Sequence, residues 1–174
     1  MFTRSALALL MIVCAPATQA QQYGFGQAPA PQLLRAWDID VSPDGAGLPP
    51  GAGSVAYGAK VYAERCSACH GLEGKGQPED RLVGGLGTLS SDKAVKTVGS
   101  FWPYATTLFD YIRRAMPFTA PQSLRDDEVY ALVAYLLNLN GIVPADAVMD
   151  STSLPAVRMP NRDGFAADPR PDVP

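Results

Sequence analysis

Apolar residues recur at the spacing of an α-helix in three stretches of this chain, residues 55–68, 104–115 and 126–139. Ser54 is suited to cap the first stretch, and Pro117 disfavours helical geometry just after the second. The apolar stripes are Val55, Ala59, Tyr62 and Cys66 in the first stretch, Leu108, Ile112 and Ala115 in the second, and Val129, Leu132, Val133, Leu136 and Leu137 in the third. The pattern predicts three helices in one compact region.

No strand pattern accompanies these helices. A Gly-rich stretch, residues 71–99, separates the first two helices and predicts loop. We therefore expect an all-α domain over residues 54–141, with an extended N-terminal arm at 21–53 and a Pro-rich C-terminal arm at 142–174. Large apolar residues in an arm are expected to dock on another surface, and here these are Trp37, Ile39, Val41 and Phe165.

Residues 1–20 have the pattern of an export signal. Arg4 gives a basic start, residues 6–13 are apolar, and Thr18-Gln19-Ala20 is suited to signal peptidase. The apolar run is far shorter than the ~20 residues that cross a bilayer. We therefore expect cleavage near Ala20, a periplasmic protein and no transmembrane segment after cleavage. A lipoprotein anchored at Cys14 is the alternative, although the bulky residue before it fits that signal poorly.

The composition narrows the possible chemistry. A formal net charge of −3 argues against a protein that binds nucleic acid through its phosphates. The chain has one His and three Cys, which excludes any site that needs two imidazoles. Cleavage near Ala20 would leave Cys66 and Cys69. A disulfide between them would close a very short loop and stabilise the fold little, so another use for these thiols is indicated.

The segment Cys66-Ser67-Ala68-Cys69-His70 has the C-x-x-C-H spacing of covalent haem attachment. Two thiols at this spacing can add to the two vinyl groups of one porphyrin, and the adjacent imidazole then lies under the iron. A thioredoxin-type dithiol is one alternative, but it belongs to a βαβ unit that the pattern lacks. Half of a zinc site is another, and it lacks a fourth ligand. One covalent haem c is the predicted cofactor, and it would also fill a domain that buries little apolar surface alone.

The sixth iron ligand follows partly by elimination, because no second His exists. Met116 lies just past the second helix, where Pro117 turns the chain out of the helix, and we expect its thioether to bind the iron. Filling of the core is the ordinary role of Met and the alternative for Met116. Met159 is the competing ligand. Coordination by His and Met raises the reduction potential and leaves no open position, which favours electron transfer over chemistry on a bound substrate.

Other haem-environment residues are predicted from their positions. The other ring nitrogen of His70 needs an acceptor, and the Pro78 carbonyl is the predicted one. Trp102 and Tyr104, just before the second helix, are expected to cover the porphyrin, with Trp102 able to donate to a propionate. Ordinary core packing is the alternative for both rings.

Two further pairs have simpler interpretations. Gly58 would permit close approach of another helix, with Tyr135 filling the space beside it. Arg113 and Arg114 fit either solvated helix charges or docking residues, and the sequence favours neither.

These residues together resemble a class I cytochrome c. The resemblance is carried by Gly58, Tyr62, Cys66–His70, Met116-Pro117 and Glu128-Val-Tyr-Ala-Leu-Val-Ala-Tyr135-Leu-Leu. A closer similarity, to the cytochrome subunit of periplasmic sulfur dehydrogenases of the thiosulfate-oxidising (Sox) system, extends into the arms. It is carried by Trp37-Asp-Ile-Asp, Asp44-Gly-Ala-Gly-Leu-Pro-Pro-Gly, Arg81-Leu-Val-Gly-Gly, Thr97-Val-Gly-Ser-Phe-Trp-Pro-Tyr through Arg-Arg-Ala-Met-Pro-Phe118, and Met159-Pro-Asn-Arg-Asp-Gly-Phe165.

The resemblance implies a partner as well as a fold. Subunits of this kind serve a molybdenum-containing sulfite or sulfur dehydrogenase and pass electrons to a downstream cytochrome c or oxidase. The best-known members carry two haems, whereas this chain has one C-x-x-C-H motif. A freely diffusing carrier cytochrome for another periplasmic dehydrogenase or oxidase is the alternative, and an open-iron haem enzyme or gas sensor is a third reading.

Overall fold

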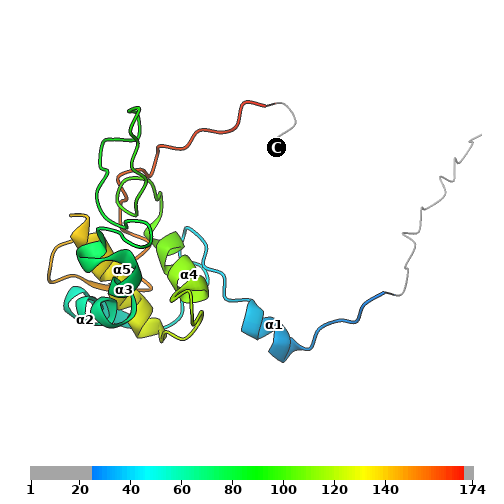
Figure 1. Ribbon diagram of the computed structural model, residues 1–174. Helices are drawn as coiled ribbons and strands as arrows, with labels where there is room; N and C mark the ends of the chain where they lie inside the picture. Colours follow the sequence, from blue (N-terminus) through cyan, green and yellow to red (C-terminus); the bar gives the residue numbers. More distant parts are fainter. Residues whose placement is uncertain (1–24, 171–174) are drawn as a thin grey trace, which may run out of the picture.

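A computed structural model of the protein describes residues 25–170. Its elements are α1 (Pro31–Trp37), β1 (Ala52–Ser54), α2 (Val55–Arg65), α3 (Ser67–His70), the 3-10 turn η1 (Leu72–Gly74), α4 (Ala105–Ala115), α5 (Asp126–Leu139) and β2 (Val148–Asp150). Helices α2, α3, α4 and α5 gather in one body, and α1 projects away from it (Figure 1).

The three predicted helices are present. The third has the predicted bounds, and the second begins one residue later than predicted. The first ends at Arg65, and Ser67–His70 form the separate helix α3. The predicted helical fold class is therefore confirmed, and the described residues add only one small two-stranded sheet to it.

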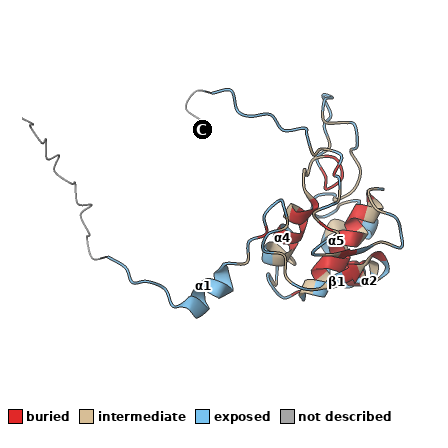
Figure 2. Ribbon diagram, turned by 180° about the vertical axis from the view of Figure 1, so that it is seen from behind, coloured by how far each residue is buried: buried red, intermediate tan, exposed pale blue. Residues whose placement is uncertain are grey.

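Helix α5 forms the centre of the core (Figure 2). Eight of its residues are buried, including every member of its predicted apolar stripe. Ala131 lies where two other elements reach the helix without an intervening side chain. A Cβ at Gly58 of α2 would collide with the carbonyl of Ala131, and one at Gly53 of β1 would collide with its backbone nitrogen. The predicted close approach at Gly58 is confirmed. A Cβ added at Gly58 would also lie only 2.8 Å from the Cβ of Tyr135.

Parts of both predicted arms belong to this body. Strand β1 pairs antiparallel with β2, with Gly53 opposite Met149, and thereby joins the segments on either side of the cytochrome-like region. Val41 before β1 and Leu154 and Met159 after β2 are buried in the same core. These stretches are predicted as extended arms because their contacts with the core are isolated residues and a three-residue pairing, which produce no periodic pattern in the sequence.

The outer part of the N-terminal segment lies apart from the core. Helix α1 has no buried residue, and the side chains of Leu33, Leu34 and Trp37 are 54%, 51% and 76% exposed. Phe165, in the C-terminal segment, packs edge-on against Phe101 with ring centroids 5.3 Å apart and remains 56% exposed. Of the four arm residues expected to dock, Val41 is buried in the chain's own core, whereas Trp37 is exposed to solvent.

The long loop between η1 and α4 is held by polar side chains. Asn140, at the end of α5, is 6% exposed; its amide donates to the Leu82 carbonyl at 3.2 Å and its oxygen accepts from the backbone N–H of Gly84 at 3.2 Å. The Thr97 hydroxyl donates to the Gly84 carbonyl at 2.6 Å. These bonds satisfy loop backbone groups that have no helix or strand partner.

None of the helices in residues 25–170 combines the length and the hydropathy that a membrane crossing requires. The predicted export signal and its cleavage near Ala20 lie outside the described residues.

The contact between Gly58 and Ala131 gives a stability prediction. Gly58→Ala should lower the free energy of unfolding by about 2 kcal/mol, because the new methyl group forces α2 away from α5. Urea unfolding of the haem-loaded protein measures this change. Lys60→Ala, on the exposed face of the same helix, should change stability by less than about 0.5 kcal/mol. Equal effects of the two substitutions would show that the helices do not meet at Gly58.

Candidate haem-binding site

The C-x-x-C-H motif begins where α2 ends. Ser54 caps the start of α2, because its hydroxyl oxygen accepts from the backbone N–H of Tyr57 at 3.2 Å, as the sequence predicts. At Cys66 the backbone leaves helical geometry, and the chain re-enters a helix for the one turn of α3. The His70 N–H donates to the Cys66 carbonyl at 2.9 Å. The two thiols and the imidazole therefore lie on one short turn, placed by the packing of α2 on α5.

The His70 ring is oriented by a backbone carbonyl. Its Nδ1 lies 2.9 Å from the carbonyl oxygen of Asp80. A carbonyl can only accept, so Nδ1 donates in this bond, and in the neutral ring Nε2 then carries the lone pair suited to a metal. Such a bond fixes the ring and makes the other nitrogen a better ligand.

The predicted acceptor, the Pro78 carbonyl, is wrong by two residues. The loop after α3 turns back on itself: the Gly76 N–H donates to the His70 carbonyl at 2.8 Å, and the Glu79 N–H donates to the Cys69 carbonyl at 2.9 Å. These bonds carry the chain past Pro78 and bring the Asp80 carbonyl to the ring. The order of carbonyls in a tight loop depends on backbone angles that the residue types alone do not reveal.

The two thiols of the motif are not joined in a disulfide. Cys66 is half-buried and Cys69 is exposed. Burial raises the pKa of the Cys66 thiol to about 11, and the neighbouring Cys69 adds to this shift. A thioredoxin-type dithiol belongs to a βαβ unit, whereas the strands of the described residues form only a two-stranded antiparallel sheet, so this alternative does not fit.

Met116 lies where α4 ends. Its N–H donates to the Ile112 carbonyl at 3.1 Å, and its own backbone is extended, so the chain leaves the helix at this residue as predicted. The side chain is half-buried against the core. Met159, the competing ligand, is only 1% exposed and packs within the core. Of the two, Met116 is the residue at the edge of the core and Met159 the one inside it.

Trp102 and Tyr104 lie at the opposite end of α4. Both are half-buried, and the Trp102 ring packs edge-on against Tyr111 with centroids 5.7 Å apart. The Arg162 guanidinium lies over the Tyr104 ring, 4.3 Å from its centroid. The place of both rings beside a porphyrin stays a prediction.

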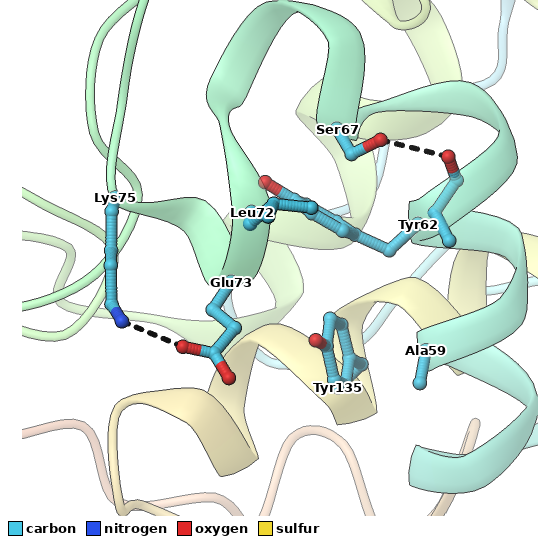
Figure 3. A pocket seen from close by; sticks show the side chains of 8 residues that line it. Ala59, Tyr62, Ser67, Leu72, Glu73, Lys75 and Tyr135 are labelled. Carbon is cyan, nitrogen blue, oxygen red and sulfur yellow. Dashed lines mark hydrogen bonds and ion pairs between the residues drawn. The ribbon is translucent and has the colours of Figure 1, made fainter.

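A hollow of about 380 Å³ lies beside α3, between α2, α5 and η1 (Figure 3). Its lining consists of Ala59, Tyr62, Ala63, Ser67, Leu72, Glu73, Lys75 and Tyr135. The rings of Tyr62 and Tyr135 meet with centroids 5.4 Å apart, and the Tyr62 hydroxyl donates to the Gly71 carbonyl at 2.9 Å. The cysteines and the histidine of the motif do not line it. The hollow is therefore separate from the motif, and one of its lining residues, Tyr62, is hydrogen-bonded to Gly71, the residue that follows His70.

Comparison with known proteins agrees with this site. The cytochrome c family model matches residues 55–140, the region from α2 to the end of α5. A solved structure, the sulfane dehydrogenase SoxCD from Paracoccus pantotrophus, contains a chain that is 42% identical, with a TM-score of 0.81, and the match covers 87% of this chain and 75% of that one. The chain belongs to the cytochrome c family and has the class I cytochrome c fold.

A second relative is a thiosulfate dehydrogenase from Psychrobacter arcticus. It is 31% identical over 117 residues, which are 63% of this chain and 35% of the relative. The chain thus spans about a third of the length of that protein.

The donor set fits the cofactor of the family. Two thiols three positions apart and an imidazole held by a carbonyl are the groups that attach a haem c and bind its iron, and Met116 stays the predicted sixth ligand. The protein is an electron-transfer cytochrome with covalently bound haem c, as the sequence predicts.

Tyr62 makes the stability of the fold depend on pH. Burial raises the pKa of Tyr62 to about 12 from its ordinary value of 10.0. The folded state therefore holds this proton more tightly than the unfolded state, and the corresponding stability is complete below pH 10 and lost as the pH rises toward 12. Tyr62→Phe should weaken this alkaline loss. Unfolding midpoints in urea between pH 8 and 12 measure it, and identical pH profiles for both proteins would contradict the assignment.

Proposed function

We propose that Cys66 and Cys69 bind the haem through thioether bonds and that His70 and Met116 are its axial ligands. The support is the turn that carries the first three groups, the free Nε2 of His70 and the position of Met116 at the end of α4. The haem iron supplies one-electron chemistry by alternating between two oxidation states. With His70 and Met116 both holding the iron, the chain would leave no open position for oxygen or peroxide.

Met116 and Met159 provide a matched test of the sixth ligand. Met116→Leu should lower the reduction potential and make the reduced protein bind carbon monoxide at neutral pH, because the iron loses its sulfur ligand. Met159→Leu should keep the potential and exclude carbon monoxide, because its side chain packs in the core. Carbon monoxide binding by the unaltered protein would contradict the proposal and favour the open-iron enzyme or sensor.

We propose further that the protein is the haem subunit of a periplasmic, molybdenum-containing sulfite or sulfur dehydrogenase. The observation that carries this proposal is the extent of the match to sulfane dehydrogenase SoxCD. It covers 87% of the chain, whereas the family model covers only residues 55–140, so the similarity includes the flanking segments as well as the haem domain. The thiosulfate dehydrogenase relative supports the same substrate class.

In this proposal the chain transfers electrons and does not itself bind the sulfur substrate. Electrons would be released by oxidation of a reduced sulfur compound in the catalytic subunit, pass one at a time through the haem, and leave to a downstream cytochrome c or oxidase. The export pattern of residues 1–20 supports a periplasmic location. One C-x-x-C-H motif provides one haem, in contrast to the two haems of the best-known subunits that the sequence resembles.

The exposed side of α1 is the proposed contact with the catalytic subunit. Leu33, Leu34 and Trp37 place three large apolar side chains on a helix that has no buried residue in this chain. Exposed apolar side chains gathered in this way are typical of a protein–protein contact.

Substitution within α1 tests the contact without disturbing the fold. Trp37→Ala, combined with alanine at Leu33 and Leu34, should weaken co-elution with the molybdenum dehydrogenase and raise the dissociation constant at least tenfold, as is typical of losing an apolar anchor. Val148→Ala, at an exposed apolar residue of β2, is the control and should leave the constant unchanged. Unchanged binding by the triple variant, with docking that depends strongly on salt, would favour the freely diffusing carrier.

A further inference from the structure

The polar face of α4 is bound to the N-terminal segment by charged side chains. Asp110 is 8% exposed, and its Oδ1 accepts from the backbone N–H of Val41 at 3.0 Å. Arg114, one turn further along α4, donates to Asp110 Oδ2 at 2.6 Å and to Asp40 Oδ1 at 2.7 Å. The buried carboxylate of Asp110 thus receives a hydrogen bond and a charge partner, which a buried charge requires.

Two further hydrogen bonds, from Arg113 and Thr106, join α4 to the N-terminal segment. Arg113 donates to the Ile39 carbonyl at 3.3 Å and pairs through Nε with Asp126 at the start of α5, at 3.0 Å. Near the beginning of α4, the Thr106 hydroxyl donates to the Pro43 carbonyl at 3.0 Å. Residues 39–43, here called the strap, therefore lie along α4 from its first turn to its last. Arg113 and Arg114, for which the sequence favoured neither solvated charges nor docking residues, both bind groups within this chain.

The strap is itself firmly held. Val41 is 7% exposed and belongs to the core. The chain then makes a tight turn, in which the Ser42 N–H donates to the Ala46 carbonyl and the Gly45 N–H donates to the Ser42 carbonyl, both at 2.9 Å. Gly47 has a φ of +89°, and a Cβ there would collide with the Asp40 carbonyl. The strap can therefore act as a fixed support for α4.

The supported end of α4 is the end from which Met116 emerges. Arg114 is two residues before Met116, and the Met116 N–H is bonded to Ile112, which lies between Asp110 and Arg114. We propose that Asp110 is a positioning residue for the bond between the haem iron and the Met116 sulfur. By joining the strap to α4, Asp110 holds the Met116 thioether at the iron. This inference rests on the proposed role of Met116 as the axial ligand.

The physical argument concerns the competition between Met116 and an added ligand. A thioether is a weak ligand whose binding depends on the chain presenting it at the right place. Loosening the end of α4 gives the displaced state more conformational freedom and thereby favours release of the sulfur. An external nitrogen ligand such as imidazole then competes more effectively for the iron.

The test measures imidazole binding to the oxidised, haem-loaded protein. Asp110→Asn keeps an oxygen for the Val41 N–H and removes the charge that holds Arg114. It should raise the affinity for imidazole about tenfold, the equivalent of one lost charge-assisted hydrogen bond. Asp40→Asn, at an exposed position, removes only the outer contact of Arg114 and should raise the affinity less. This milder variant keeps the test usable if Asp110→Asn fails to fold.

Asp150→Asn is the matched control. Asp150 accepts from the Thr152 and Ser153 N–H groups in a turn of the C-terminal segment, so its loss destabilises the fold without touching α4. It should lower the urea midpoint and leave imidazole affinity unchanged. Equal affinities in the wild type, Asp110→Asn and Asp40→Asn would overturn the positioning role, as would an equal rise in Asp150→Asn. If Met116 is not a ligand, the unaltered protein itself lacks the sulfur-to-iron absorption band, which separates that failure from this one.

Discussion

The close contact of α2 and β1 with Ala131 of α5 is the constraint on which the rest of this structure depends. Gly58 and Gly53 leave no room for a side chain at these crossings. With backbones this close, the direction of α2 is fixed relative to the buried α5, and so is the place where α2 ends. The C-x-x-C-H turn starts at that point. A small steric requirement in the core therefore determines where the thiols and imidazole of the haem site lie.

The other half of the site is placed by different means. Much of the chain between η1 and α4 has no regular structure, and its backbone groups are satisfied by side chains such as Thr97 and Asn140. The segments outside the cytochrome domain take part as well: β1 pairs with β2, and residues 39–43 lie along α4. A small domain that binds a large cofactor has a limited apolar core, and these flanking contacts enlarge it. In this chain they also reach the helix that precedes Met116.

The sequence predicted the parts of the structure that have a local signature. The apolar stripe of α5 gave its bounds, Ser54 gave the start of α2, and the extended backbone at Met116 followed from Pro117. The haem motif was readable because its chemistry requires adjacent residues. Long-range contacts were not readable. The Asp80 carbonyl replaced that of Pro78, and Asp110, which looks like an ordinary helix charge in the sequence, is buried against a segment 69 residues away. Such partners are determined by tertiary packing, which no periodic pattern records.

The central claim is that one haem is covalently attached to this chain through Cys66 and Cys69. The most direct measurement is the mass of the denatured protein after production in a host that exports and matures c-type cytochromes. The account predicts the mass of the polypeptide plus one haem, with the colour retained by the protein in acidified acetone. A polypeptide without added mass, with the haem extracted into the solvent, would contradict it.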